Sequence, residues 1–191
     1  MNTPNKLTII RIILTPIFLA LLIIDFPHHM LIAAAVFIIA SITDYFDGNI
    51  ARKRGIETDF GKFLDPIADK MLTTVAFLGF IYMGYGYGII WVTAIVLFRE
   101  FAIMSVRLVA ASSGKVIAAN IWGKFKTVSQ MVSIITVMLM EYLISLGFLG
   151  DTGIFAIRVG YSVLLWISAL LTVISGITYI YQNRECVNFN K

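Results

Sequence analysis

The stretch DYFDGNIARKRGIETDFGKFLDPIADK, residues 44–70, holds six of the eleven acidic residues in a chain of 191 amino acids. The rest of the chain is strongly apolar, so that 59% of all residues are hydrophobic and only 14% are charged. This composition, with a mean hydropathy of +0.89, lies far outside the range of soluble domains. The sequence therefore predicts an integral membrane protein, interrupted by this acidic segment.

Apolar segments on both sides of the acidic segment predict membrane-spanning helices, each of which needs about 20 residues to cross the hydrocarbon layer. Six such segments lie at about residues 7–24, 30–43, 66–83, 88–110, 125–148 and 154–181. We expect an all-α integral membrane protein with six transmembrane helices, formed by a single domain that covers residues 1–191. Because the number of spans is even, both termini are expected on the same side.

The distribution of basic residues predicts which side that is. The turns at 25–29, 84–88 and 147–153 contain no lysine or arginine, and only Arg158 lies near them. The opposite side receives eleven basic residues: Lys6, Arg52, Lys53, Arg54, Lys62, Lys70, Lys115, Lys124, Lys126, Arg184 and Lys191. The positive-inside rule then predicts a multi-pass protein of the cell membrane with cytoplasmic termini and basic loops. The formal net charge of +4 requires no nucleic-acid partner, because such residues favour anionic lipid headgroups.

The depth of the acidic residues in the membrane follows from where the neighbouring apolar segments begin and end. The second apolar segment ends just before Asp44 and Asp47, and the third begins just after Asp65 and Asp69. On helices, residues three or four positions apart share a face, so each pair points in one direction. We therefore expect four carboxylates to converge at the level of the inner lipid headgroups.

Four converging carboxylates repel one another unless cations neutralise them, and burial near lipid increases the cost. Oxygen ligands suit Mg²⁺ or Mn²⁺, with Ca²⁺ also possible, and the lack of a nearby histidine or cysteine argues against zinc. Paired metals held by carboxylates bridge phosphate oxygens, and at headgroup depth that phosphate belongs to a lipid. The alternative is a solvated loop with ordinary surface ion pairs, which the matched depth of the two acid pairs disfavours.

Other residues near the acidic segment suit a phosphorylated ligand. Gly48, Ala51 and Gly61 leave room for close approach, and Arg52 supplies a cation. At the same end of the first segment, Thr8 and Arg11 stand one helical turn apart, within reach of a nucleotide or phosphate. The alternative for Arg11 is that its side chain extends to the lipid headgroups.

The acidic segment resembles a known family. Its pattern is Asp44-x-x-Asp47-Gly48-x-x-Ala51-Arg52, eight residues, Gly61, three residues, Asp65, three residues and Asp69, which matches the full signature of the CDP-alcohol phosphatidyltransferases. The resemblance implies a six-helix membrane enzyme, commonly a homodimer, with two divalent metal ions in a cytoplasm-facing site. It further implies that Asp44, Asp47 and Asp65 ligate metal, and that Asp69 is a metal neighbour and the general base. CDP-diacylglycerol is the implied donor, near Thr8, Arg11, Gly48, Ala51, Arg52 and Gly61.

Two flanking stretches, NKLTIIR at 5–11 and REFAIMSVRLVAASSGKVIAANIWGKFKT at 99–127, are similar to the bacterial phosphatidylglycerophosphate synthases of that family. This similarity implies transfer of a phosphatidyl group from CDP-diacylglycerol to sn-glycerol 3-phosphate, with release of CMP. Basic residues in the second stretch agree, because a phosphorylated acceptor needs counter-charges. We expect Arg107, Lys124 and Lys126 to bind glycerol 3-phosphate, whereas Lys115 is equally well explained as a loop residue.

Charged residues inside the fourth and fifth segments have structural explanations. Glu100 and Arg107 lie seven residues apart on one helical face, so we expect them to form an ion pair. For Glu141 we expect a hydrogen bond that packs two helices together. His28 and His29 lie in an outer turn, far from the acidic segment, and receive no catalytic role.

Two other interpretations remain open at this level. One is an enzyme of the same family with another acceptor, such as inositol phosphate, serine or phosphatidylglycerol. The other is a divalent-metal or proton-coupled transporter, because acids at membrane depth also mark ion pathways. Against transport, all four signature aspartates are expected at one membrane edge, and the second and third segments are uninterrupted at mid-depth.

Overall fold

The computed structural model describes residues 3–54, 59–112 and 121–184; for residues 3–7, 44–54, 59–66, 69 and 112 it describes the backbone only. Within these ranges the chain is helical and contains no strand, which confirms the all-α prediction. The helices are α1 Thr3–Ile23, α2 His29–Arg54, α3 Asp59–Met83, α4 Ile89–Ser112, α5 Ile121–Ser145 and α6 Asp151–Gln182.

Three of these helices are long and apolar enough to cross a membrane: Ile89–Ala111, Ile121–Ser145 and Asp151–Gln182. The first three helices contain shorter apolar stretches, Thr8–Ile23, His29–Thr43 and Lys70–Met83. In α2 the acidic segment follows the apolar part, and in α3 it precedes the apolar part. Both helices are therefore longer than the apolar segments from which they were predicted. The protein is membrane-embedded on this composition, and six of its eleven acidic residues lie where α2 leads into α3.

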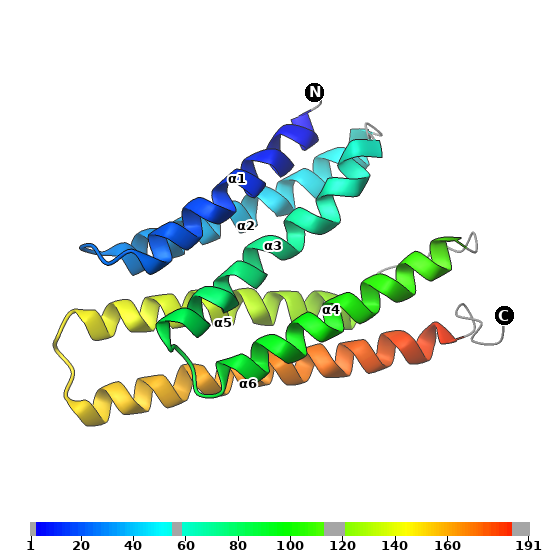
Figure 1. Ribbon diagram of the computed structural model, residues 1–191. Helices are drawn as coiled ribbons and strands as arrows, with labels where there is room; N and C mark the ends of the chain where they lie inside the picture. Colours follow the sequence, from blue (N-terminus) through cyan, green and yellow to red (C-terminus); the bar gives the residue numbers. More distant parts are fainter. Residues whose placement is uncertain (1–2, 55–58, 113–120, 185–191) are drawn as a thin grey trace.

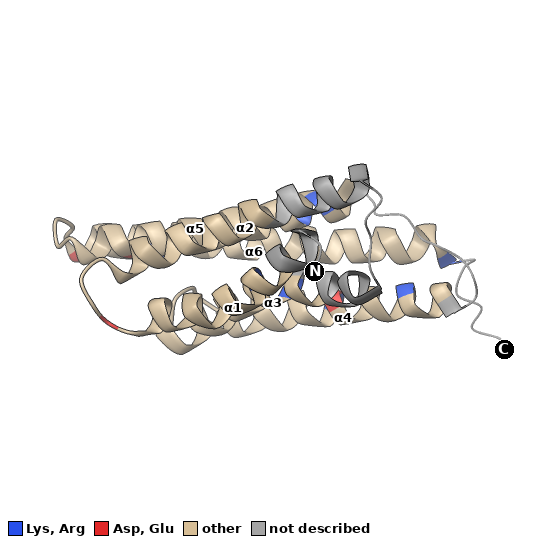
Figure 2. Ribbon diagram, turned by 90° about the horizontal axis from the view of Figure 1, so that it is seen from above, with Lys and Arg blue, Asp and Glu red and all other residues tan. Residues whose placement is uncertain are grey.

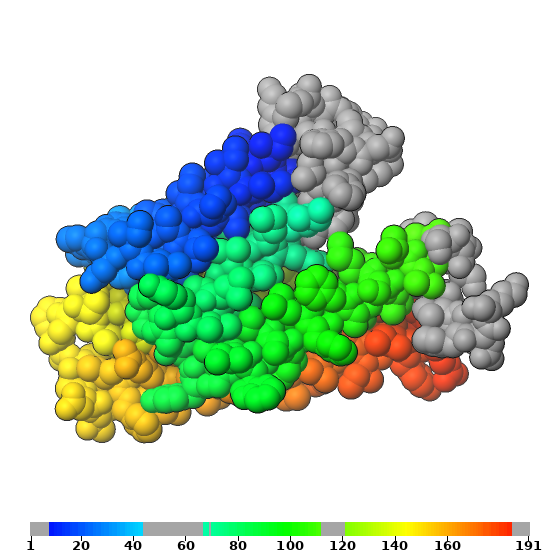
Figure 3. Space-filling model, in the orientation of Figure 1, coloured from blue at the N-terminus to red at the C-terminus, as the bar shows by residue number. Residues whose placement is uncertain are grey.

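The six helices form two groups (Figure 1). In the first group α1 packs against α2 and α3, and in the second group α6 packs against α4 and α5. The groups meet where α2 contacts α5 and where α3 contacts α4 and α5. On the face shown in Figure 3, α3 lies between α1 and α4. Helix α3 therefore connects the half that carries the acidic segment to the half that carries the basic residues of α4 and α5.

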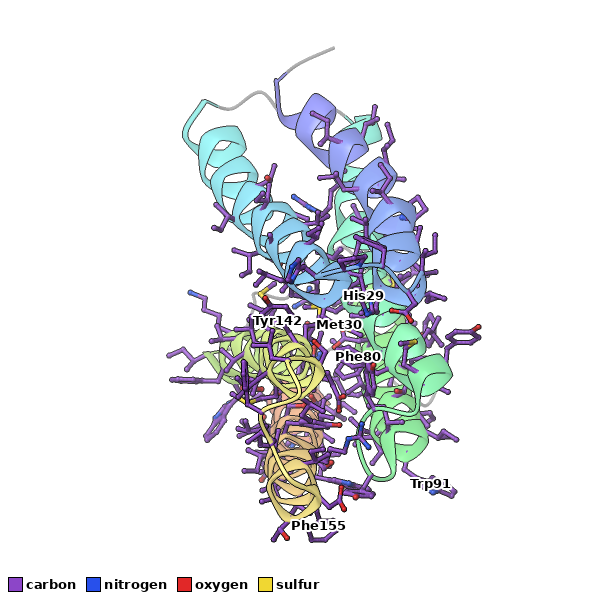
Figure 4. All side chains as sticks on the ribbon, turned by 90° about the vertical axis from the view of Figure 1, so that its left-hand side faces the viewer. His29, Met30, Phe80, Trp91, Tyr142 and Phe155 are labelled. Carbon is purple, nitrogen blue, oxygen red and sulfur yellow. The ribbon has the colours of Figure 1, made fainter. Side chains whose placement is uncertain are left out.

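The core of the first group is aromatic and closely packed. Phe18 of α1 and Phe37 of α2 are fully buried, with ring centroids 5.5 Å apart. Gly79 of α3 lies against Leu22 of α1, and a Cβ atom at this position would overlap with the leucine side chain. In Figure 4, the view from the end with the short turns, Phe80 lies in the interior, whereas the side chain of Trp91 points away from the bundle. This packing holds α1 close to both helices of the acidic segment.

The interior of the second group is more polar. Buried small or hydroxyl-bearing residues form one face of α6: Ser162, Ser168, Ala169, Thr172, Ser175 and Gly176. Gln130 of α5 donates a hydrogen bond of 2.9 Å to Thr172 within this interface. Small residues allow membrane helices to approach closely, and hydrogen bonds between helices add to their association. Most of the helical surface in Figure 2 carries no charge, as expected for lipid-facing helices.

Candidate active site

The signature aspartates lie on two helices that both pack against α1. Helix α2 carries Asp44 and Asp47, and helix α3 carries Asp65 and Asp69. Only residues 55–58 separate the two helices, so the acids lie near the same end of the hairpin (Figure 1). The side chains of these aspartates lie outside the described residues. Their convergence therefore stays a prediction, which the helix arrangement permits.

Several side chains of the predicted donor site also lie outside the described residues. Gly48, Ala51 and Arg52 belong to α2 and Gly61 belongs to α3, again without described side chains. Next to this region, Ala68, the chain neighbour of Asp69, is fully buried, whereas Ile67 and Met71 are exposed.

Thr8 and Arg11 of α1 are described in full, and both are buried. Their exposed fractions are 1% and 2%, so the Arg11 side chain does not extend to the surface of the bundle. This burial argues against the interpretation that Arg11 only reaches for lipid headgroups. A buried guanidinium on the helix that contacts both α2 and α3 is suitably placed for a phosphate group near the acidic segment.

Three cations surround Glu100, which is 9% exposed. Lys126 of α5 donates a hydrogen bond to its Oε1 atom. Lys70 of α3 lies 3.3 Å from its Oε2 atom, and Arg99 donates to Oε1 over 3.2 Å. We call these four residues the Glu100 cluster. It joins α3, α4 and α5, and its member Lys70 is the residue that follows Asp69 in the chain.

Arg99 extends the Glu100 cluster to α6. Its second guanidinium nitrogen donates a hydrogen bond of 2.8 Å to Ser175. The aliphatic part of Arg99 packs against Gly176, where an added Cβ atom would lie 3.0 Å from the arginine Cγ. Neither Ser175 nor Gly176 belongs to a sequence motif that connects it with the site, and a serine and glycine pair on the buried face of α6 is the one signal in the sequence.

The predicted ion pair between Glu100 and Arg107 is wrong. Arg107 donates from Nε to the Tyr179 hydroxyl over 2.9 Å, and its guanidinium carbon lies 5.3 Å from the centroid of that ring. The two residues share a face of α4, but seven residues correspond to a rise of about 10.5 Å along a helix. Cations from neighbouring helices are closer to Glu100, and the buried Tyr179 of α6 holds Arg107 instead.

The two lysines that we expected to act together lie on different faces of α5. Lys126 is buried in the Glu100 cluster, whereas Lys124 is exposed. Residues two positions apart on a helix are separated by about 200°, so they cannot both face the bundle interior. The structure thus places Lys126 in the Glu100 cluster, leaves Arg107 exposed beside Tyr179, and places Lys124 on the outward face. Lys115 lies outside the described residues.

A second buried carboxylate lies toward the other end of the bundle. Glu141 of α5 is 5% exposed and accepts hydrogen bonds from Arg158 over 3.1 Å and from Tyr161 over 2.5 Å. Both donors belong to α6, so the prediction that Glu141 packs two helices together is confirmed. We call these three residues the Glu141 cluster. Burial, followed by the negative charge of Glu141, raises the pKa of Tyr85 in the nearby turn.

The histidines lie at this same end and contact neighbouring residues. His28 shares a hydrogen bond of 3.1 Å with the hydroxyl of Tyr142, and His29 lies 3.8 Å from the Asp25 carboxylate. Figure 4 shows His29 and Tyr142 near the start of α2 and the end of α5. These contacts connect the turn before α2 to α5 and involve no residue of the acidic segment.

Among the residues with described side chains, no group of three or more histidine, cysteine, aspartate or glutamate residues could hold a metal ion. The predicted ligands Asp44, Asp47, Asp65 and Asp69 lie outside that set. Their chemistry fits a hard divalent cation, because the donors are carboxylate oxygens on two adjacent helices. Among the residues with described side chains, Lys70 and Lys126 are two cations near this acidic region, and both contact Glu100.

Comparison with known proteins agrees with these features. A model of the CDP-alcohol phosphatidyltransferase family matches residues 1–177. CDP-diacylglycerol–glycerol-3-phosphate 3-phosphatidyltransferase of Bacillus subtilis is 36% identical in an alignment that covers 97% of each chain. The protein of that name from Rickettsia bellii is 36% identical over 93% of each chain. A probable phosphatidylglycerophosphate synthase of Mycobacterium tuberculosis is 38% identical over 94% of this chain and 80% of its own length. The chain belongs to the CDP-alcohol phosphatidyltransferase family.

Proposed function

We propose that the protein transfers the phosphatidyl group of CDP-diacylglycerol to sn-glycerol 3-phosphate, giving phosphatidylglycerophosphate and CMP. The observation that carries this proposal is the similarity to the Bacillus subtilis enzyme of that name, which extends over 97% of each chain. The cationic residues on α4 and α5 support the phosphorylated acceptor, because serine, a zwitterion without a phosphate, would not need two further positive groups beside the donor site.

The donor is proposed to bind where α1, α2 and α3 meet. Asp44, Asp47 and Asp65, together with Asp69, would hold two divalent cations, Mg²⁺ or Mn²⁺. When bound, such ions neutralise the diphosphate of the donor and the charge that develops on the CMP leaving group. Thr8, Arg11 and Arg52 would contact the phosphates or the nucleotide, and Gly48, Ala51 and Gly61 would leave room for them. The burial of Arg11 supports its part in this assignment.

Asp69 is proposed as the general base. The 1-hydroxyl oxygen of glycerol 3-phosphate attacks the β-phosphorus of CDP-diacylglycerol while the bond from that phosphorus to the CMP oxygen breaks. The hydroxyl proton passes to the Asp69 carboxylate, and CMP leaves with the bonding electron pair. This role requires that the acceptor lie between Asp69 and the cations of α4 and α5.

The acceptor phosphate is proposed to contact Lys126 and Arg107. Lys126 is buried next to Lys70, which follows Asp69 in the chain, so one acceptor can reach both a cation and the base. Arg107 has its Nε atom bound to Tyr179, which leaves its terminal nitrogens for a phosphate. Lys124, on the outward face of α5, would contribute attraction for anions rather than a contact.

All six helices are proposed to span the cell membrane, with both termini and the active site facing the cytoplasm. The absence of lysine and arginine from the turns at 25–29, 84–88 and 147–153 supports this orientation. We further propose that the chain forms a single membrane domain that assembles as a homodimer.

The test is a reaction of the purified protein with CDP-diacylglycerol, Mg²⁺ and a set of acceptors. We expect CMP release that depends on glycerol 3-phosphate and exceeds the release obtained with inositol phosphate, serine or phosphatidylglycerol. CMP release that does not depend on glycerol 3-phosphate would overturn the assignment. Metal flux into protein-containing vesicles that lack CDP-diacylglycerol would favour a transporter instead.

A further inference from the structure

Helix α6 holds both arginines of α4 through hydroxyl groups on its buried face. Arg99 donates a hydrogen bond of 2.8 Å to Ser175, and Arg107 donates one of 2.9 Å to Tyr179. Ser175 and Tyr179 are four residues apart, so they lie one helical turn apart on the same face. We propose that these two residues of α6 are positioning residues for the glycerol 3-phosphate acceptor. This inference rests on the proposed function and concerns which helix fixes the acceptor-binding cations.

Two neighbouring hydroxyls on the same face of α6 have neutral partners. Ser168 donates to a carbonyl oxygen of its own helix over 2.8 Å, and Thr172 accepts from the side-chain amide of Gln130 over 2.9 Å. Hydrogen bonds of this kind are sufficient to pack membrane helices together. The hydroxyls of Ser175 and Tyr179, which lie closer to the end of α6, instead accept from guanidinium groups. Because hydrogen bonds to charged groups are the stronger kind, these two contacts can fix the position of a cation.

Tyr179 holds the Arg107 guanidinium in two ways. Its hydroxyl accepts from the Nε atom, and the guanidinium carbon lies 5.3 Å from the centroid of its ring. Tyr179 is 2% exposed, so packing fixes its ring, whereas the Arg107 side chain is exposed. The contact at Nε leaves the two terminal nitrogens, which can bind a phosphate in a bidentate manner. A guanidinium that is already oriented loses less conformational freedom when the acceptor binds.

Ser175 acts on the other proposed acceptor contact, Lys126, through two intervening residues. Arg99 donates to Ser175 with one terminal nitrogen and to the Oε1 atom of Glu100 with the other, over 3.2 Å. The same Oε1 atom accepts from Lys126. The Nε atom of Arg99 is buried and has no hydrogen-bond partner among the described residues, so Ser175 and Glu100 hold this guanidinium there. A shift of Arg99 should therefore move the carboxylate that Lys126 contacts.

The residue after Ser175 makes room for Arg99. Gly176 lies against the aliphatic part of the arginine, and an added Cβ atom would lie 3.0 Å from the arginine Cγ. The arginine would then have to move by a few tenths of an ångström. Gly160, on the same helix, has no heavy atom of a neighbouring residue within 4 Å of an added Cβ atom. Alanine at these two positions thus provides one change that displaces Arg99 and a matched change that does not.

The experiment measures full-length variants purified in detergent. S175A removes the hydroxyl that binds Arg99, and S168A is its control, because Ser168 is an equally buried serine that bonds within α6. G176A displaces Arg99 without removing a hydrogen-bonding group, and G160A is its control. The KM values for glycerol 3-phosphate and CDP-diacylglycerol, the kcat and the thermal unfolding midpoint are measured for each variant.

We expect S175A to raise the KM for glycerol 3-phosphate by about fivefold, the equivalent of one hydrogen bond. The kcat and the KM for CDP-diacylglycerol should stay unchanged, because the lost interaction serves acceptor binding. Y179F should have a similar effect. The double variant S175A/Y179F should raise the acceptor KM by about 25-fold, because Arg99 and Arg107 lie about 12 Å apart along α4 and should respond independently.

G176A should also raise the acceptor KM and leave the donor KM unchanged. S168A and G160A should change neither KM, and S168A should lower only the unfolding midpoint. If S175A is not recovered in folded form, G176A decides in its place, and a wild-type acceptor KM in G176A overturns the inference.

Three results would reduce Ser175 and Tyr179 to a role in helix packing: an unchanged acceptor KM in either S175A or Y179F, an equal rise of both KM values, or the same acceptor defect in S168A. The proposed function is decided separately, by the acceptor dependence of the wild-type protein. A wild-type enzyme that uses glycerol 3-phosphate, together with one of these three results, leaves the function intact and removes only the positioning role.

Discussion

Glu100 and Glu141 are both buried glutamates in membrane helices, yet their surroundings differ. Glu100 contacts three cations that belong to α3, α4 and α5. Glu141 contacts one arginine and one tyrosine, both from α6. The Glu141 cluster pairs one carboxylate with donors from a single neighbouring helix, whereas the Glu100 cluster connects one carboxylate to cations on three helices. The first arrangement packs two helices together, and the second joins three helices next to the acidic segment.

This difference predicts that charged residues at one end of the bundle affect catalysis, whereas those at the other end affect stability. Charges near the junction of α2 and α3 should control turnover and substrate affinity. Charges near the opposite turns should control the free energy of unfolding only. Changes at the two ends of the bundle should therefore differ in their effects, and the largest is a complete loss of activity.

The largest effect is expected from metal removal. Chelation with EDTA should abolish CMP release, because the proposed metal ligands are four carboxylates that cannot bind a diphosphate without cations. Addition of Mg²⁺ or Mn²⁺ should restore activity. EDTA should change the unfolding midpoint of the E141Q variant by the same amount as that of the wild type, because no metal is proposed for the Glu141 cluster. Full activity in EDTA would contradict the metal assignment.

Asp69→Asn should have the next largest effect. An amide cannot accept the hydroxyl proton, so turnover should fall by about 10²-fold to 10⁴-fold, the usual contribution of a general base. Donor binding, measured with labelled CDP-diacylglycerol, should be largely retained because the other three aspartates remain. Near-normal turnover would exclude Asp69 as the base.

Lys126→Met and Lys124→Met provide a contrast within one helix. Loss of Lys126 should raise the KM for glycerol 3-phosphate by about 10-fold to 100-fold, through the lost charge-assisted contact. Loss of the exposed Lys124 should raise it less, because its interaction with the acceptor is long-range and screened by salt. The contrast is measured at two salt concentrations. Equal rises in the KM for glycerol 3-phosphate would contradict the proposal that Lys126, and not Lys124, contacts the acceptor.

The sequence was sufficient for the overall organisation of the protein. Apolar segments predicted six helices near the observed positions, since hydrophobic length alone is a strong signal in membranes. The signature of the acidic segment indicated the family, which the comparisons confirm. It also predicts Asp44, Asp47, Asp65 and Asp69 as a group, and this stays a prediction because their side chains lie outside the described residues.

The partners of the basic residues could not be predicted in this way. Spacing along α4 shows that Glu100 and Arg107 share a face, but it does not reveal which residues of α3, α5 and α6 meet that face. Tyr179 and Ser175 belong to no recognisable motif, so their contacts with Arg107 and Arg99 depend on tertiary packing. Lys124 and Lys126 are close in sequence, and only the rotation of α5 separates them.

A smaller effect is expected for Tyr179→Phe. The substitution removes the hydroxyl that accepts from Arg107 but keeps the aromatic ring beneath the guanidinium. Loss of one hydrogen bond of about 1 kcal/mol should raise the acceptor KM by about fivefold. Tyr181→Phe is the matched control, because the exposed Tyr181 contacts Arg184 rather than Arg107. Identical kinetics for both variants would show that Arg107 needs no support from Tyr179.

The smallest effect on turnover is expected at the Glu141 cluster. Arg158→Met leaves Glu141 with Tyr161 as its hydrogen-bond donor in this cluster, so the buried carboxylate loses its counter-charge. The Arg158 side chain is 43% exposed, and solvent therefore screens the pair, so the loss in the free energy of unfolding should be about 1 kcal/mol. Thermal unfolding in detergent measures that loss, and CMP release measures turnover. A change in the KM for either substrate would show that the two ends of the bundle are coupled, and that the number of helices joined by a buried carboxylate does not by itself distinguish a functional role from a structural one.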